Sequence, residues 1–207
     1  MGNTNIGNKP LNRIKIGLPK GSFIKYSNKI IATLIGNCLE EKRLSYQNDL
    51  YEVYLVKLRD VPKLLENNII DVGITCDEWL AETGAKVEVL KKLDWCDTKI
   101  SLIGCIEIEK MADKKISCIT EYPNIAKRYF EAKNIEHSIY TISGSSEAFV
   151  PNRFDYCIDC VETQGTLNAN KLNEIEVILR SKIVLARSNQ SNASIDELLG
   201  CIEGLVL

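Results

Sequence analysis

Residues 13–22 have the sequence Arg-Ile-Lys-Ile-Gly-Leu-Pro-Lys-Gly-Ser, in which alternating polar and apolar residues lead into a Pro-Lys-Gly turn. The alternation predicts a β-strand, and the proline and glycine end it. Residues 23–39 then carry apolar side chains at helical spacing, which predicts a helix with one buried face. This order of strand, turn and helix decides the fold, because it recurs along the chain.

Further strands and helices alternate through the rest of the sequence. We expect strands at residues 51–58, 69–75, 99–107, 115–120, 137–142, 155–161 and 175–186. We expect helices at residues 60–67, 77–82, 122–130 and 195–202. Such alternation favours an α/β fold with mostly parallel sheets. Because these sheets bind ligands outside the carboxyl ends of their strands, a binding site is expected in the turns that follow strands.

Composition excludes several classes of protein. The 207 residues are 45% hydrophobic and 26% charged, and the formal net charge is -2. Without a basic excess, nucleic acid is not an expected partner. No apolar run reaches the roughly 18 residues of a membrane span, and residues 1–10 have no apolar signal-peptide core. We therefore expect a cytoplasmic protein that does not bind membranes.

The eight cysteines are scattered, which is typical of reduced, buried thiols. One pair, Cys157 and Cys160, has the CxxC spacing of zinc sites and redox pairs. Both lie in a predicted strand, where positions three apart point to opposite faces, so the two sulfurs do not converge. We expect no metal bound permanently by the chain.

The turn after the strand at residues 155–161 is the strongest candidate site. It reads Glu162-Thr163-Gln164-Gly165-Thr166. Backbone N–H groups, two hydroxyls and the start of a helix together make a phosphate cradle. Asp155 and Asp159 precede the turn, and their carboxylates can accept hydrogen bonds from ribose hydroxyls or hold the Mg²⁺ of a diphosphate. The alternative is a capped helix start with solvated acids.

Other turns give weaker signals. Lys20 and Gly21 offer a cation and a close backbone approach after the first strand. Arg59, or its neighbour Lys57, places a cation after the next strand. Two further candidates are the small-residue segment 71–76, which contains Thr75, and the donor-rich loop 143–147, which ends in Glu147.

Taken together, these segments resemble ATP phosphoribosyltransferase, the first enzyme of histidine biosynthesis. The resembling segments are residues 16–21, 59–62, 71–75, 83–85, 122–130, 144–147 and 161–170. The resemblance implies two α/β lobes of periplasmic-binding-protein type (type II), with the active site in the cleft between them. Lobe I then comprises residues 1–102 and 184–207, and lobe II residues 103–183. The chain is similar to the short form, which lacks a C-terminal regulatory domain.

The resemblance also implies a reaction and its participants. The family joins N1 of ATP to 5-phosphoribosyl 1-diphosphate, gives phosphoribosyl-ATP and diphosphate, and requires Mg²⁺ with the diphosphate. Short forms work with a subunit resembling histidyl-tRNA synthetase, and a homodimer is also expected. The resemblance assigns catalytic cations to Lys20, Arg43 and Arg59. It assigns substrate contacts to Gly21, Ser22, Thr75, Glu147, Asp155, Asp159, Glu162, Thr163, Gln164, Gly165 and Thr166.

Three positions depart from the family's pattern. Ser22 stands where an arginine is usual, and Gln164 and Cys76 stand where glycines are usual. Ser22 removes a cation from the region where diphosphate leaves. The alternatives are therefore a relative that uses another acceptor, and a non-catalytic ligand-binding or regulatory protein on the same fold.

Overall fold

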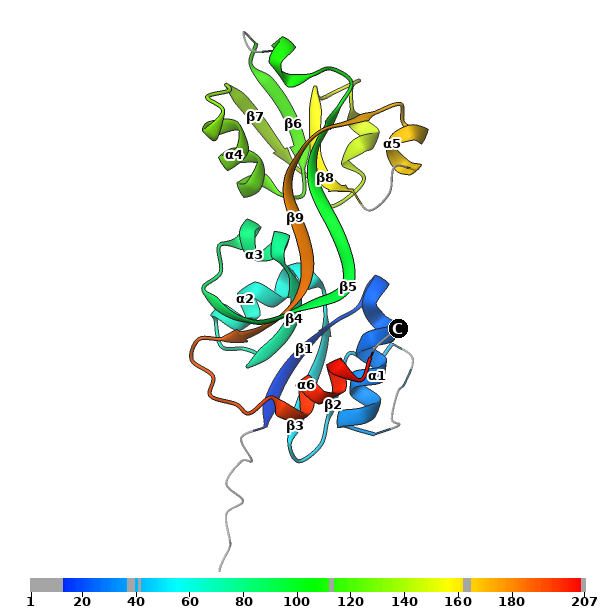
Figure 1. Ribbon diagram of the computed structural model, residues 1–207, viewed down its shortest axis with the longest axis vertical. Helices are drawn as coiled ribbons and strands as arrows, with labels where there is room; N and C mark the ends of the chain where they lie inside the picture. The colour runs from blue at the N-terminus through cyan, green and yellow to red at the C-terminus, as the bar shows by residue number, and fades with distance from the viewer. Residues whose placement is uncertain (1–12, 37–39, 41, 112–113, 162–164, 206–207) are drawn as a thin grey trace, which may run out of the picture. The chain divides into compact units, whose positions relative to one another are not determined.

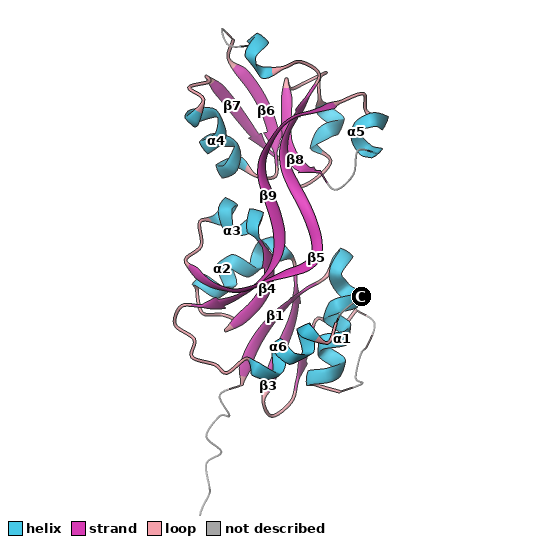
Figure 2. Cartoon of the chain, in the orientation of Figure 1, coloured by secondary structure: helices cyan, strands magenta, loops and turns pink. Residues whose placement is uncertain are grey.

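A computed structural model describes residues 13–36, 40, 42–111, 114–161 and 165–205 (Figures 1 and 2). Its strands are β1 (Ile14–Pro19), β2 (Ser45–Gln47), β3 (Tyr51–Val56), β4 (Val72–Cys76), β5 (Val87–Gly104), β6 (Ile116–Thr120), β7 (His137–Thr141), β8 (Tyr156–Val161) and β9 (Asn173–Ser188). Its α-helices are α1 (Ile24–Leu34), α2 (Val61–Glu66), α3 (Asp77–Thr83), α4 (Pro123–Ala132), α5 (Gly165–Ala169) and α6 (Asp196–Glu203). Short 3₁₀ turns are η1 (Gly21–Phe23), η2 (Leu58–Asp60), η3 (Ile108–Met111) and η4 (Ser146–Phe149). No helix in the described ranges is long and apolar enough to cross a membrane.

The strands follow the order β2-β3-β1-β4-β9-β5-β8-β6-β7, and contacts divide the chain into two compact units. Unit 1 comprises Met1–Thr75, Ala85–Lys91 and Leu185–Leu207, and unit 2 comprises Cys76–Gly84 and Lys92–Val184. The long strands β5 and β9 contribute residues to both units. Contacts thus group residues 76–84 and 92–102 with unit 2, whereas the lobe boundaries expected from the sequence lie near residues 102 and 184. As functional lobes, those boundaries stay a prediction.

In unit 1, parallel pairing brings the carboxyl ends of three strands to one edge. β1 pairs in parallel with both β3 and β4, and β2 joins β3 in the antiparallel sense. Gly17 and Gly73 are register partners across β1 and β4. A Cβ on Gly17 would lie 2.6 Å from Cδ1 of Ile70, and one on Gly73 would lie 2.8 Å from Cγ1 of Val61. Both glycines therefore allow the buried side chains of α2 and its following loop to pack directly on the strands.

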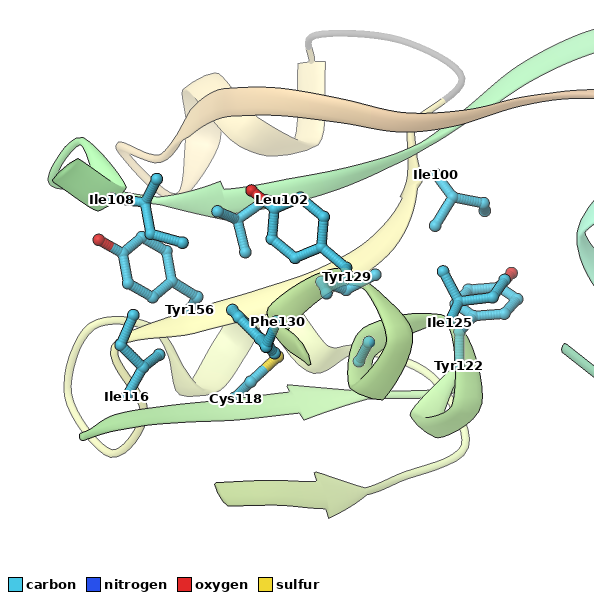
Figure 3. Close-up of a cluster of buried hydrophobic side chains, with 12 residues drawn as sticks. Ile100, Leu102, Ile108, Ile116, Cys118, Tyr122, Ile125, Tyr129, Phe130 and Tyr156 are labelled. Atoms are coloured by element: carbon cyan, nitrogen blue, oxygen red, sulfur yellow. The ribbon is translucent and has the colours of Figure 1, made fainter. Parts of the chain in front are cut away.

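Unit 2 also contains parallel strands, and apolar clusters cover both faces of them. β6 pairs in parallel with β7 and β8, while β5 is antiparallel to β8. Figure 3 shows the cluster on the α4 face, where the fully buried ring of Phe130 lies among side chains from α4 and the strands. The cluster on the other face comprises Ile103, Ile119, Val150, Cys157, Val161, Leu167 and Leu172. The carboxyl ends of β6, β7 and β8 share one edge.

Cys157 and Cys160 both lie in β8, as the sequence predicts. Cys157 belongs to the cluster with Val161, whereas Cys160 packs against the α4-face cluster. The two sulfurs thus lie on opposite sides of β8. The described cysteines are free thiols.

Candidate active site

At the shared edge of unit 1, the first turn presents Lys20 and Gly21. The Lys20 N–H donates to the carbonyl of Val56 at 2.9 Å, which ties this turn to the end of β3. Gly21 has φ of +78°, a left-handed conformation that side chains disfavour. Ser22 follows within η1 and is exposed. The turn thus offers backbone and a lysine to solvent, without a second cation at position 22.

A hollow of about 440 Å³ in unit 1 brings Lys20 and Gly21 together with Arg43. Arg43 is held from three sides: Nε donates to the Ser45 carbonyl at 2.9 Å, one terminal nitrogen lies 2.6 Å from Oε1 of Glu40, and the guanidinium lies 5.1 Å from the centroid of the Tyr46 ring. A guanidinium fixed in this way still has N–H donors for an anion. The remaining lining residues are Ile24, Asn28, Lys42, Leu44 and Leu55.

The turn after β3 carries Arg59, and Thr75 supports that turn. The hydroxyl of Thr75 is buried and donates to the carbonyl of Leu58 at 2.9 Å. Because its hydroxyl is used inside the fold, Thr75 positions the segment that holds Arg59. Arg59 Nε lies 3.9 Å from Oδ1 of Asp60, a partly exposed and weak pair. Lys57, directly after β3, is exposed.

In unit 2, the described part of the predicted phosphate turn has the expected order of elements. β8 ends at Val161 and α5 begins at Gly165. Glu162, Thr163 and Gln164 lie outside the described residues, as does the side chain of Thr166. Leu167 anchors α5 by packing in the same cluster as Val161. The roles expected for residues 162–166 stay predictions.

Two predicted acids, Asp159 and Glu147, are close to one another near this edge. The carboxylate of Asp159 accepts hydrogen bonds from the Ser146 hydroxyl and from the Cys160 N–H, the latter at 2.7 Å. Glu147, next to Ser146 in η4, is half-buried. Burial raises the pKa of Glu147, and the negative charge of Asp159 raises it further. The two carboxylates form an acidic pair suited to hydroxyl groups of a sugar.

Asp155 is separated from this pair. It precedes the first residue of β8, and its carboxylate accepts hydrogen bonds from the backbone N–H of Ser117 at 2.8 Å and from the Ser117 hydroxyl at 2.6 Å. A six-residue strand is about 20 Å long, and the candidate turn follows the other end of β8. Asp155 therefore joins β8 to β6 at the end of β8 opposite the candidate turn, and its expected contact with substrate stays a prediction.

A second hollow, of about 550 Å³, contains basic residues that the sequence analysis missed. Its lining residues come from both long strands and from the ends of α3 and β8: Asp77, Lys92, Asp97, Thr98, Lys99, Val161, Arg180, Ser181 and Lys182. No local signal marks them, because charged residues on a strand are usually solvated. Val161, which lines this hollow, directly precedes the candidate turn in the sequence.

Comparisons with known proteins identify the family and the fold. The family model described as HisG, ATP phosphoribosyltransferase, matches residues 57–204. An ATP phosphoribosyltransferase from Alkaliphilus metalliredigens is 32% identical over 176 residues, which cover 82% of this chain and 84% of that protein. An ATP phosphoribosyl transferase (HisG:HisZ) complex from Thermotoga maritima has a chain that superimposes with a TM-score of 0.81 at 20% identity, covering 92% and 99% of the two chains.

A putative L-cystine ABC transporter structure from Listeria monocytogenes also has a similar fold, with a TM-score of 0.64, 13% identity, and coverage of 93% of this chain and 89% of that one. The α/β fold of periplasmic-binding-protein type is thereby confirmed, while the position of the active site between the lobes stays a prediction. The match over residues 57–204, with the relative that is 32% identical, decides the family. The chain belongs to the ATP phosphoribosyltransferase family, the transferases of the first step of histidine biosynthesis.

Proposed function

We propose that this chain joins N1 of ATP to 5-phosphoribosyl 1-diphosphate and releases diphosphate. The observation that carries the proposal is the family match over residues 57–204. It is supported by β8 and α5, which flank the candidate turn in the sequence, and by the acidic pair Glu147 and Asp159 close to the carboxyl end of β8. A phosphate cradle beside two carboxylates suits a sugar phosphate.

Unit 2 is proposed to bind the phosphoribosyl donor. In this proposal the 5-phosphate accepts hydrogen bonds from Thr163, Gly165 and Thr166, and Gln164 contributes its backbone N–H. The carboxylates of Glu162, Glu147 and Asp159 accept hydrogen bonds from ribose hydroxyls. Asp159 is already oriented by Ser146 and by the Cys160 N–H, so its carboxylate needs little reorganisation to bind a hydroxyl.

The chemistry requires positioning and charge neutralisation. N1 of the adenine forms a bond to C1 of the ribose while the bond from C1 to the diphosphate oxygen breaks, and the diphosphate leaves with the electron pair. Positive charge develops on the ribose and negative charge on the diphosphate, so fixed groups of opposite charge lower the barrier. We assign Lys20, Arg43 and Arg59 to the phosphates of the two substrates. No protein nucleophile is needed.

Mg²⁺ is proposed to enter with the diphosphate. Oxygen donors are its preferred ligands, and Glu147 and Asp159 supply carboxylates close to one another. In the ranges that the structure describes, no group of three or more His, Cys, Asp or Glu side chains is arranged to hold a metal. Substrate phosphates and water would therefore provide most of the ligands, and Mg²⁺ would add positive charge to the leaving diphosphate.

The proposal extends to a partner. The similar structure from Thermotoga maritima is described as a HisG:HisZ complex. We propose that this chain works in the cytoplasm with a subunit of that kind, one resembling histidyl-tRNA synthetase, and as a homodimer. Neither nucleic acid nor a membrane is a proposed partner.

The direct test is release of diphosphate. The chain, alone and with a candidate partner subunit, is mixed with Mg²⁺ and with ATP, the donor, both or neither. Diphosphate that appears only when both substrates are present supports the proposal. The exposed Ser22, which supplies no charge where the family has arginine, favours one second candidate, a ligand-binding protein. Binding of both substrates without turnover, with or without the partner, would support that candidate and contradict catalysis.

A further inference from the structure

Among the described residues that line the hollow of about 550 Å³ in unit 2, none has been assigned a role above. The hollow is lined by four basic side chains, Lys92, Lys99, Arg180 and Lys182, and by two acidic ones, Asp77 and Asp97. Its volume lies in the range of small-molecule sites. The hollow therefore has room for an anionic group. Its position in unit 2 and its basic side chains indicate which anionic group it binds.

The position follows from strand register. Lys99 on β5 is the partner of Val161 on β8, and both line the hollow. Side chains two apart on a strand share a face, so Lys99 is on the same face as Ile103. Ile103 and Val161 pack in the cluster that contains Leu167 of α5. The hollow thus lies on the α5 face, at the carboxyl end of β8.

Three of the four basic residues already have acidic partners. Nζ of Lys99 lies 2.7 Å from Oε2 of Glu174. Nζ of Lys92 lies 3.1 Å from Oδ2 of Asp77. Nζ of Lys182 lies 2.8 Å from Oδ1 of Asp94 and 3.4 Å from Oδ1 of Asp97. These pairs neutralise the lysine charges locally, so they do not by themselves create an anion site.

Arg180 differs from the lysines. It is exposed and makes no side-chain hydrogen bond or ion pair with any residue that the structure describes. Its planar group offers five N–H donors that match two oxygens of a phosphate. Thr98 and Ser181 line the same hollow. Arg180 is therefore a charged donor available to a ligand.

We propose that Arg180 binds the diphosphate group of the phosphoribosyl donor in this hollow. The inference rests on the proposed function, because it needs the 5-phosphate of the same molecule in the turn that follows Val161. A donor with phosphates on both sides of one ribose requires a second anion site close to the first. Arg180 then supplies a cation for the leaving diphosphate.

The experiment is a calorimetric titration of the folded chain with three probes in the presence of Mg²⁺: inorganic diphosphate, ribose 5-phosphate and the complete donor. Arg180→Gln should weaken binding of diphosphate and of the donor about tenfold or more, because one charge-assisted interaction is lost. It should leave ribose 5-phosphate binding unchanged. Arg180→Lys, which keeps the charge but loses the fork, should lie between the two. Arg153→Gln, at an exposed arginine before β8, is the matched control and should bind every probe as the wild type does.

The outcomes separate this inference from the proposed function. If Arg180→Gln binds diphosphate and the donor like the wild type, the inference is overturned while donor binding stands. If the wild type binds neither the donor nor ribose 5-phosphate, the proposed function fails and the inference fails with it. An unchanged thermal unfolding midpoint for Arg180→Gln shows that the variant is folded, and a lowered midpoint leaves Arg180→Lys to decide.

Discussion

The carboxylate of Glu82, in α3, accepts a hydrogen bond from the backbone N–H of Ile125, in α4, at 2.9 Å. Its other oxygen accepts the Asn124 N–H at 3.0 Å, and Glu82 is only 6% exposed. Helix α4 begins at Pro123, and its N-cap residue, Tyr122, makes no side-chain capping bond. A carboxylate from another helix therefore caps α4, where free N–H groups and the helix dipole both favour negative charge.

Glu82→Ala should lower the free energy of unfolding by about 3 kcal/mol, because it removes two charge-assisted bonds and leaves the buried N–H of Ile125 unpaired. Urea denaturation measures the change. Glu131→Ala is the control: its carboxylate lies 3.8 Å from Nζ of Lys127 in an exposed pair, so less than about 0.5 kcal/mol is expected. A Glu82→Ala variant as stable as this control would show that the cap contributes nothing.

Thr166→Ala should weaken binding of ribose 5-phosphate about tenfold or more. The expected cause is the loss of one hydroxyl hydrogen bond to the phosphate, which costs about 1.5–3 kcal/mol. Isothermal calorimetry measures the affinity. Thr33→Ala, which removes an exposed hydroxyl bonded to the Lys29 carbonyl in α1, should bind the sugar phosphate normally. Unchanged affinity in Thr166→Ala would place the phosphate elsewhere.

Lys20→Ala and Arg59→Ala should each reduce kcat by about 10²–10³, because each removes a positive group that stabilises charge on the phosphates in the transition state. Steady-state kinetics with saturating substrates measures this. Lys63→Ala provides the control, since Nζ of Lys63 lies 2.8 Å from Oε2 of Glu66 and the lysine is 55% exposed. If both variants turn over like the control, these turns do not contact the phosphates during the reaction.

Glu147 should make stability depend on pH. Burial raises its pKa in the folded state, and the charge of Asp159 adds to the shift. A carboxyl whose folded pKa is raised keeps its full contribution to stability below its unfolded pKa and loses it as pH rises through the folded pKa. Above the folded pKa of Glu147, the Glu147→Gln variant should therefore have a higher free energy of unfolding than the wild type. At pH values below the unfolded pKa, the two proteins should not differ in this way. Unfolding free energies measured across this range check the sign; a constant difference between the proteins would contradict it.

Local sequence predicts most strands and helices of this chain, because their apolar spacing matches their burial. β5 is the main exception: it begins at Val87, whereas the expected strand begins at residue 99. Residues before Ile100 in β5 are mostly exposed or half-buried, so they lack the apolar alternation that marks a strand. β2 is missed because three residues give no period to detect.

The candidate site is predictable where one turn carries the chemistry, and less so where distant segments meet. Lys20 and Arg43 line one hollow, yet only the family resemblance connects them in the sequence. Asp155 and Asp159 are neighbours in the sequence but separate along β8, since the first bonds to Ser117 on β6. The sequence does not mark Arg180 as a site residue. Arg180 lines the hollow because β9 lies beside β5, and this pairing of distant segments cannot be predicted from local sequence.

The central claim is best tested by identifying the product. The chain, with its partner subunit if one is required, is incubated with ATP, 5-phosphoribosyl 1-diphosphate and Mg²⁺, and the products are analysed by mass spectrometry and NMR. We predict an adduct with the mass of ATP plus one phosphoribosyl group, attached at N1 of the adenine, in equal amount to the diphosphate released. Diphosphate release without this adduct, or an adduct formed only with another acceptor, would contradict the account.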